Sequence, residues 1–165
     1  MSNKFLYTQK MMSEDLKSIY NAISHENFVP DYIVGMARGG LVPATCLSHT
    51  MQIPMMTLEW SKSRQRVNQN LCELISNQKA NIMIVDDIVD TGDLLKELFQ
   101  DWERWCDFDE SFIDCSAIRV ASLVNYKVND VLYENLSGSI MCNYYGRSMS
   151  ERPWVDFWWE VMDVN

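Results

Sequence analysis

The sequence has no apolar run that approaches the roughly 20 residues a transmembrane helix needs, so we expect no membrane span. Its first residues contain neither the apolar segment nor the small-residue cleavage site of a secretory signal peptide. These absences predict a cytoplasmic protein with no membrane partner. The 165 residues suffice for one domain with a buried core.

The usual zinc and redox patterns are also missing. The five cysteines are scattered without a C-x-x-C pair and there are two histidines, so we expect reduced, mostly buried thiols. Positive charge is scarce as well. The formal net charge of −9 disfavours nucleic-acid partners, because non-specific binding needs a basic face. A phosphorylated ligand must therefore be held locally, by backbone amides, a few cations and a metal.

Short apolar runs alternate with segments of helical periodicity along the chain. Strands that alternate with helices predict a parallel β-sheet covered on both faces, with ligands bound beyond the carboxyl ends of the strands. The expected strands lie at residues 31–35, 81–85 and 116–124, and the expected helices at residues 13–24 (with Ser13 as N-cap), 41–51 and 94–105.

The string IVDDIVDTGD at residues 84–93 is the segment in which we expect the chemistry. A strand runs into the adjacent carboxylates Asp86 and Asp87, and Asp90 then precedes a Thr-Gly turn at the start of a helix. Buried carboxylates need donors or a cation, and the free amides of a helix N-terminus bind anions. This pattern suits a sugar phosphate. Solvated loop acids with Asp90 as an N-cap would explain any single residue, but they explain the whole string poorly.

This string resembles the phosphoribosyl-pyrophosphate signature of type I phosphoribosyltransferases. VGMARGGLVP at residues 34–43 resembles the pyrophosphate loop of the same family. The resemblance implies an α/β fold with a central, mainly parallel β-sheet flanked by helices. It implies a single domain with a core at about 13–130 and a small C-terminal hood at about 131–165. It also implies a glycosyltransferase that uses phosphoribosyl pyrophosphate and Mg²⁺ and forms a homodimer or homotetramer.

The resemblance further implies a role for each motif residue. Arg38 and magnesium would neutralise the departing pyrophosphate, Asp86 and Asp87 would hold the ribose hydroxyls and the metal, and Asp90 would be the general base. The polar loop at residues 61–70 would close over the site. The other substrate-binding residues implied by the two motifs are Ala37, Gly39, Val89, Thr91, Gly92, Asp93 and Leu94.

The C-terminal string RPWVDFWWE at residues 152–160 is similar to the closing segment of 6-oxopurine phosphoribosyltransferases. By that resemblance Trp154 stacks on the purine, Val155 offers backbone groups and Glu160 lies near the 2-position, while Lys127 faces the 6-oxo group. The expected reaction is transfer to guanine, xanthine or hypoxanthine in purine salvage. Packing in the core or in a dimer is expected for at least one of the three tryptophans in this string.

Two alternatives stay open. Asp93 and Leu94 stand where the family usually has a small or basic residue and then Thr or Ser, which favours a non-catalytic regulator that senses phosphoribosyl pyrophosphate. The acceptor could also be a pyrimidine or another base, although Lys127 and Trp154 weigh against this. A dinucleotide-binding domain is excluded because residues 35–40 read G-x-x-x-G-G, and a DNA-binding module because no basic helix is present.

Overall fold

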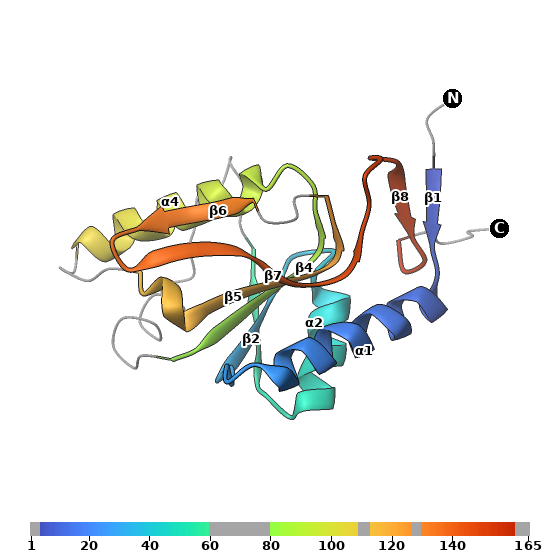
Figure 1. Ribbon diagram of the computed structural model, residues 1–165, viewed down its shortest axis with the longest axis horizontal. Helices are drawn as coiled ribbons and strands as arrows, with labels where there is room; N and C mark the ends of the chain where they lie inside the picture. Colours follow the sequence, from blue (N-terminus) through green and yellow to red (C-terminus); the bar gives the residue numbers. More distant parts are fainter. Residues whose placement is uncertain (1–3, 60–79, 109–112, 127–129, 161–165) are drawn as a thin grey trace.

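The computed structural model describes residues 4–59, 80–108, 113–126 and 130–160. A six-stranded sheet with the order β3-β2-β4-β5-β7-β6 forms its centre, and β1 and β8 form a separate two-stranded sheet (Figure 1). All neighbouring strands pair in parallel except β6, which is antiparallel to β7. The strands are β1 (Lys4–Tyr7), β2 (Tyr32–Met36), β3 (Met55–Leu58), β4 (Ile82–Val89), β5 (Ile118–Asn125), β6 (Val131–Asn135), β7 (Gly138–Ser148) and β8 (Trp154–Phe157).

Helices cover both faces of the six-stranded sheet, which explains why its central strands are apolar throughout. On β2, Ile33 packs into the core beneath α1 and α2, whereas its neighbour Val34 packs into the core beneath α4 (Figure 1). None of the described helices is long and apolar enough to cross a membrane. The helices are α1 (Gln9–His25), α2 (Leu41–Met51), α4 (Asp93–Phe108) and the short 3₁₀ turn η1 (Cys115–Ala117).

The predicted α/β class is confirmed, and each predicted strand and helix has a counterpart. The first helix begins earlier than predicted, because the Thr8 hydroxyl accepts the Met11 backbone N–H at 3.3 Å and so caps α1 at Gln9. The prediction that Ser13 is the N-cap is wrong. The sequence concealed the first turn because Met12 is its first buried residue and the residues before Met12 give no apolar periodicity.

The C-terminal segment differs from the predicted hood at about 131–165. β6 and β7 extend the main sheet, with β7 beside β5, so the segment through Ser148 belongs to the core. The two-stranded sheet instead joins β8 to β1 from the N-terminal end of the chain, and the Trp158 N–H extends this pairing to the Tyr7 carbonyl at 3.0 Å. Residues far apart in sequence therefore build the small second sheet, which we call the β1–β8 hood.

A buried ion pair fixes the β1–β8 hood to the main sheet. Arg147, near the end of β7, donates two hydrogen bonds to Asp15 of α1, from Nε to Oδ2 at 2.7 Å and from Nη2 to Oδ1 at 2.9 Å. The Tyr7 hydroxyl of β1 donates to the same carboxylate at 2.5 Å. Burial and the Asp15 carboxylate together raise the pKa of Tyr7, so the phenol remains a donor at every physiological pH. One carboxylate thus links β1, α1 and β7.

We expect Asp15→Asn to lower the free energy of unfolding by about 3 kcal/mol, because it leaves the Arg147 guanidinium without its counter-charge. Lys4→Gln is the matched control. The Lys4–Asp156 pair, at 3.0 Å, is largely exposed at Lys4, and its loss should cost less than about 1 kcal/mol. Urea unfolding followed by tryptophan fluorescence measures both values. Equal losses in the two variants would contradict a dominant role for the buried pair.

Candidate active site

The two glycine- and aspartate-rich motifs meet at the carboxyl ends of β2 and β4. A Cβ atom on Gly39 would overlap the Asp87 carboxylate, and one on Gly40 would overlap the Val85 carbonyl oxygen. The loop is anchored on its other side by the Ala37 N–H, which donates to the Leu58 carbonyl at 2.9 Å, and the Ala37–Arg38 peptide is cis. Glycine is required at position 40 because the Cβ would meet the backbone of β4, whereas a side chain at position 39 would displace the Asp87 carboxylate.

Asp86 and Asp87 are the two polar residues of the otherwise apolar strand β4, and Ile88 and Val89 follow them at its end. Asp86 is buried and accepts the Asp87 backbone N–H at 3.0 Å, while Asp87 is half-buried. Burial, and then the charge on Asp87, raise the pKa of Asp86 well above its usual range, and burial also raises the pKa of Asp87. Burial and the nearby Asp86 charge raise the pKa of Cys142 to about 11, so the thiol stays neutral.

This carboxylate pair has the chemistry of a divalent-cation site. No described residue forms an ion pair with Asp86 or Asp87, and burial raises the pKa of both carboxyl groups. Mg²⁺ prefers oxygen ligands and is commonly held by one or two carboxylates together with water and substrate phosphates. The residues present therefore fit magnesium.

The turn after β4 leads directly into the first turn of α4. Gly92 has a φ of 76°, a left-handed conformation that favours glycine, and α4 begins at the next residue, Asp93. The Asp93 N–H donates to the Thr91 hydroxyl at 3.3 Å. Leu94 is 40% exposed, beside this turn. The helix N-terminus supplies amide donors, while the Asp93 carboxylate lies where an incoming phosphate would meet like charge.

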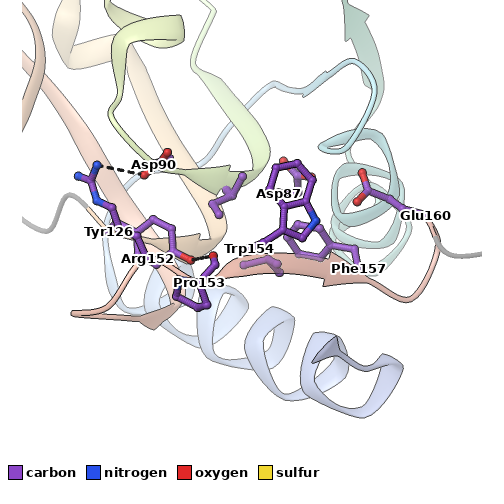
Figure 2. Close-up of a pocket in the computed structure, with 10 residues that line it drawn as sticks. Asp87, Asp90, Tyr126, Arg152, Pro153, Trp154, Phe157 and Glu160 are labelled. Carbon is purple, nitrogen blue, oxygen red and sulfur yellow. Dashed lines mark hydrogen bonds and ion pairs between the residues drawn. The ribbon is translucent and has the colours of Figure 1, made fainter. Parts of the chain in front are cut away.

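A cleft of about 570 Å³ opens beside these strand ends, between β4 and the β1–β8 hood (Figure 2). In this view Asp90, Tyr126 and Arg152 lie at one end, Glu160 lies at the other, and Trp154 lies between them. Trp154 is 68% exposed, which leaves its indole face open to a ligand. The lining residues are Asp87, Ile88, Asp90, Tyr126, Arg152, Pro153, Trp154, Val155, Phe157 and Glu160.

A second cavity, of about 310 Å³, lies on the loop side of the cleft and is lined by Arg38, Gly39, Trp159 and Glu160. Glu160 borders both cavities. Burial and the Asp87 charge raise its pKa, and Arg38 opposes that shift. The glycine loop, the acidic end of β4 and the end of the β1–β8 hood therefore surround one continuous region.

Seven of the fifteen predicted site residues line the two cavities: Arg38, Gly39, Asp87, Asp90, Trp154, Val155 and Glu160. Asp86 is buried near the end of β4 and lines neither cavity. The Val89 side chain is buried in the core beneath α4, so it cannot contact a ligand in the cleft. Ala37 is half-buried in the loop, and the residues of the Thr91–Leu94 turn do not line either cavity. Lys127 and the predicted closing loop at residues 61–70 lie outside the described residues.

Sequence reasoning missed Ile88, Tyr126, Arg152, Pro153 and Phe157 as lining residues. A signal for three of them was available. Arg152 and Pro153 directly precede Trp154, and Tyr126 follows the last residue of β5, where side chains of a parallel sheet meet ligands. The expectation that one tryptophan serves packing is confirmed by Trp159, which stacks on Phe157 with ring centroids 4.6 Å apart.

The sequence profile of the phosphoribosyl transferase domain matches residues 4–100, more than half of the chain. The chain belongs to the phosphoribosyltransferase family. It is therefore a glycosyltransferase-type enzyme, and the family implies phosphoribosyl pyrophosphate and a base as substrates. Its mainly parallel sheet with flanking helices is the type I phosphoribosyltransferase fold. No curated protein sequence matches the chain significantly.

Solved structures share the fold over almost the whole length of this phosphoribosyltransferase. They include a purine phosphoribosyltransferase from Pyrococcus horikoshii (TM-score 0.67, 23% identity, 99% of this chain and 98% of that one). They also include a hypothetical protein from Neisseria gonorrhoeae with bound ppGpp (0.70, 17%, 99% and 93%) and a xanthine-guanine-hypoxanthine phosphoribosyltransferase from Helicobacter pylori (0.62, 18%, 98% and 95%). At these identities the likeness establishes a common fold.

We expect Asp86→Asn to stabilise the metal-free protein by about 2 kcal/mol at pH 7.5, because it removes a buried charge and keeps an acceptor for the Asp87 N–H. The pKa of Asp86 is higher in the folded than in the unfolded protein. The group therefore costs the wild type no stability at pH values below its pKa in the unfolded chain. As the pH rises from there toward the pKa of Asp86 in the folded protein, ionisation of the buried carboxyl group lowers the free energy of unfolding. The gain should therefore vanish near pH 4.

Thermal unfolding in chelator at both pH values measures this difference. Asp93→Asn, at an exposed position in the first turn of α4, is the control and should give no gain, because its charge favours the helix dipole. A gain in Asp86→Asn that persists at pH 4 would show that the buried charge is not its cause.

Proposed function

We propose that the chain transfers the 5-phosphoribosyl group from phosphoribosyl pyrophosphate to a 6-oxopurine base and releases pyrophosphate, as in purine salvage. The observation that carries this proposal is the cleft, in which an open indole platform, Trp154, faces the acidic end of β4. A flat aromatic ligand can stack on the indole while its sugar-bearing edge points toward Asp87 and Asp90. The whole-length likeness to purine phosphoribosyltransferases supports a purine acceptor.

The sugar pyrophosphate would span the region between the glycine loop and α4. Its 5′-phosphate would accept hydrogen bonds from the turn amides and the Thr91 hydroxyl at the start of α4. Its ribose hydroxyls would bind the Asp86–Asp87 pair, and its pyrophosphate would lie beside Arg38 and the Gly39 backbone, in the smaller cavity. Asp86 and Asp87 would hold magnesium, which supplies positive charge to the leaving group when bound.

The charges that form during the proposed reaction determine the roles of the nearby side chains. As the C1–pyrophosphate bond breaks, negative charge grows on the leaving oxygen beside Arg38, and the guanidinium stabilises it. The purine nitrogen that forms the new bond to C1 loses its proton to the Asp90 carboxylate, which lines the cleft and is half-exposed. The β1–β8 hood and the stacked base would keep water away from C1.

The direct test is a steady-state assay with phosphoribosyl pyrophosphate, Mg²⁺ and a panel of purine and pyrimidine bases. We expect nucleotide formation with a 6-oxopurine, and at least a 100-fold lower kcat in Asp90→Asn because general-base catalysis contributes at least that factor. Glu14→Gln, at an exposed position on α1 outside the cleft, is the control and should keep its kcat. Magnesium-dependent binding of the sugar pyrophosphate without turnover on any base would overturn the proposal in favour of a regulator.

The acceptor platform gives a separate expected result. Trp154→Ala should raise KM for the base by roughly 5- to 150-fold, because base–aromatic stacking contributes about 1–3 kcal/mol. KM for phosphoribosyl pyrophosphate should not change. Trp158→Ala is the control, since Trp158 is 39% exposed in the same segment but does not line the cleft. Equal effects of the two substitutions would assign Trp154 to hood packing instead of base binding.

A further inference from the structure

The cleft has an uneven distribution of charge. Of the described residues that line it, Asp87, Asp90 and Glu160 are carboxylates and Arg152 is the single cation. An acceptor that carries carbonyl oxygens needs hydrogen-bond donors, and carboxylates can only accept when they are ionised. Among the described lining residues, the Arg152 guanidinium is therefore the charged side chain that can donate to such an edge. Lys127, which the sequence resemblance assigns to the 6-oxo group, lies outside the described residues.

Two contacts of the Arg152 side chain, and one hydrogen bond to the adjacent backbone, hold this residue beside the strand ends. Its Nη1 lies 3.4 Å from Asp90 Oδ1, and its guanidinium lies 6.0 Å from the centroid of the Tyr126 ring (Figure 2). The Tyr126 hydroxyl donates to the carbonyl of the next residue, Pro153, at 3.1 Å. This last bond fixes the backbone between Arg152 and the stacking residue Trp154, so the guanidinium and the indole belong to one positioned segment.

A ligand can replace Asp90 as the partner of the Arg152 guanidinium at little cost in free energy. The two side chains are 47% and 53% exposed, and pairs of that exposure contribute little to stability. The 3.4 Å separation is also longer than the 2.7–2.9 Å of a strong charge-assisted hydrogen bond. A ligand oxygen with better geometry can therefore take the guanidinium from Asp90 at small cost.

We propose that Arg152 is a specificity-determining residue that leaves Asp90 and binds the oxo edge of the acceptor base. This inference rests on the proposed function. The guanidinium has five N–H donors and no acceptor, so a carbonyl oxygen satisfies it, whereas an exocyclic amino group would place donors against donors. A site built on donors discriminates strongly against a ligand that lacks the matching acceptor. Arg152 thus favours 6-oxopurines over 6-aminopurines.

The exchange also connects acceptor binding to catalysis. In the free protein one oxygen of the Asp90 carboxylate lies 3.4 Å from the Arg152 guanidinium. When an oxopurine takes over the guanidinium, Asp90 is released toward the purine nitrogen that must lose its proton. The correct acceptor would thereby free the general base, while a base without the oxo group would leave it paired.

The test compares Arg152→Gln and Arg152→Lys with wild type, using hypoxanthine, guanine and xanthine as substrates and adenine as a substrate or competitive inhibitor. Lys10→Gln is the matched control, because Lys10 is an exposed cation on α1 outside the cleft. We expect Arg152→Gln to raise KM for the oxopurines at least tenfold with kcat within about threefold. The constant for adenine should stay the same or fall, and Arg152→Lys should restore part of the oxopurine affinity.

Each other outcome has a distinct meaning. An unchanged KM for oxopurines in Arg152→Gln, with an active wild type, overturns this inference alone. A uniform fall in kcat on every base together with a lower Tm assigns Arg152 a structural role and also overturns it. A higher KM for phosphoribosyl pyrophosphate, with base constants unchanged, moves the residue to the phosphate side and overturns it as well. A wild type that turns over no 6-oxopurine overturns the proposed function, and this inference with it.

Discussion

The burial of two adjacent carboxylates at the end of β4 is the constraint on which the site depends. Asp86 and Asp87 have no described cationic partner, and their raised pKa values show the cost of placing charge there. A side chain at position 39 would displace the Asp87 carboxylate, because the loop lies against it. A metal ion would supply the positive charge, and the hydroxyl groups of a sugar the hydrogen-bond donors, that these two carboxylates lack in the free protein. The same buried charge would then both destabilise the free site and favour substrate binding.

The β1–β8 hood is placed over that site by contacts at both of its ends. At one end Asp15 joins Tyr7 to Arg147, so that the hood is fixed to α1 and to the end of β7. At the other end the Tyr126 hydroxyl holds the Pro153 carbonyl beside β5. If Trp154 stacks on the acceptor base as proposed, a segment fixed at both ends would present it with little loss of entropy on binding.

Features that depend on residues close together in the sequence were predicted, whereas features that depend on contacts between distant residues were not. β2, α2, β4 and β5 follow from local apolar periodicity, and the two motifs follow from local strings, so these predictions are confirmed in position. The pairing of β8 with β1 and of β7 with β5 depends on contacts between distant parts of the chain, which periodicity does not contain. The position of Arg152 before Trp154 was a signal in the sequence, but its contact with Asp90 depends on the fold.

The distribution of charge explains how an acidic protein can serve anionic and electron-rich ligands. With a net charge of −9 the chain gains nothing from long-range steering of a sugar pyrophosphate, and three carboxylates line the cleft itself. In the proposed reaction, attraction would come from groups in direct contact with the ligands: the amides at the start of α4, Arg38 beside the smaller cavity and Arg152 in the larger one. Because such contacts are short-ranged and directional, ligand selection at this site depends on geometry more than on overall charge.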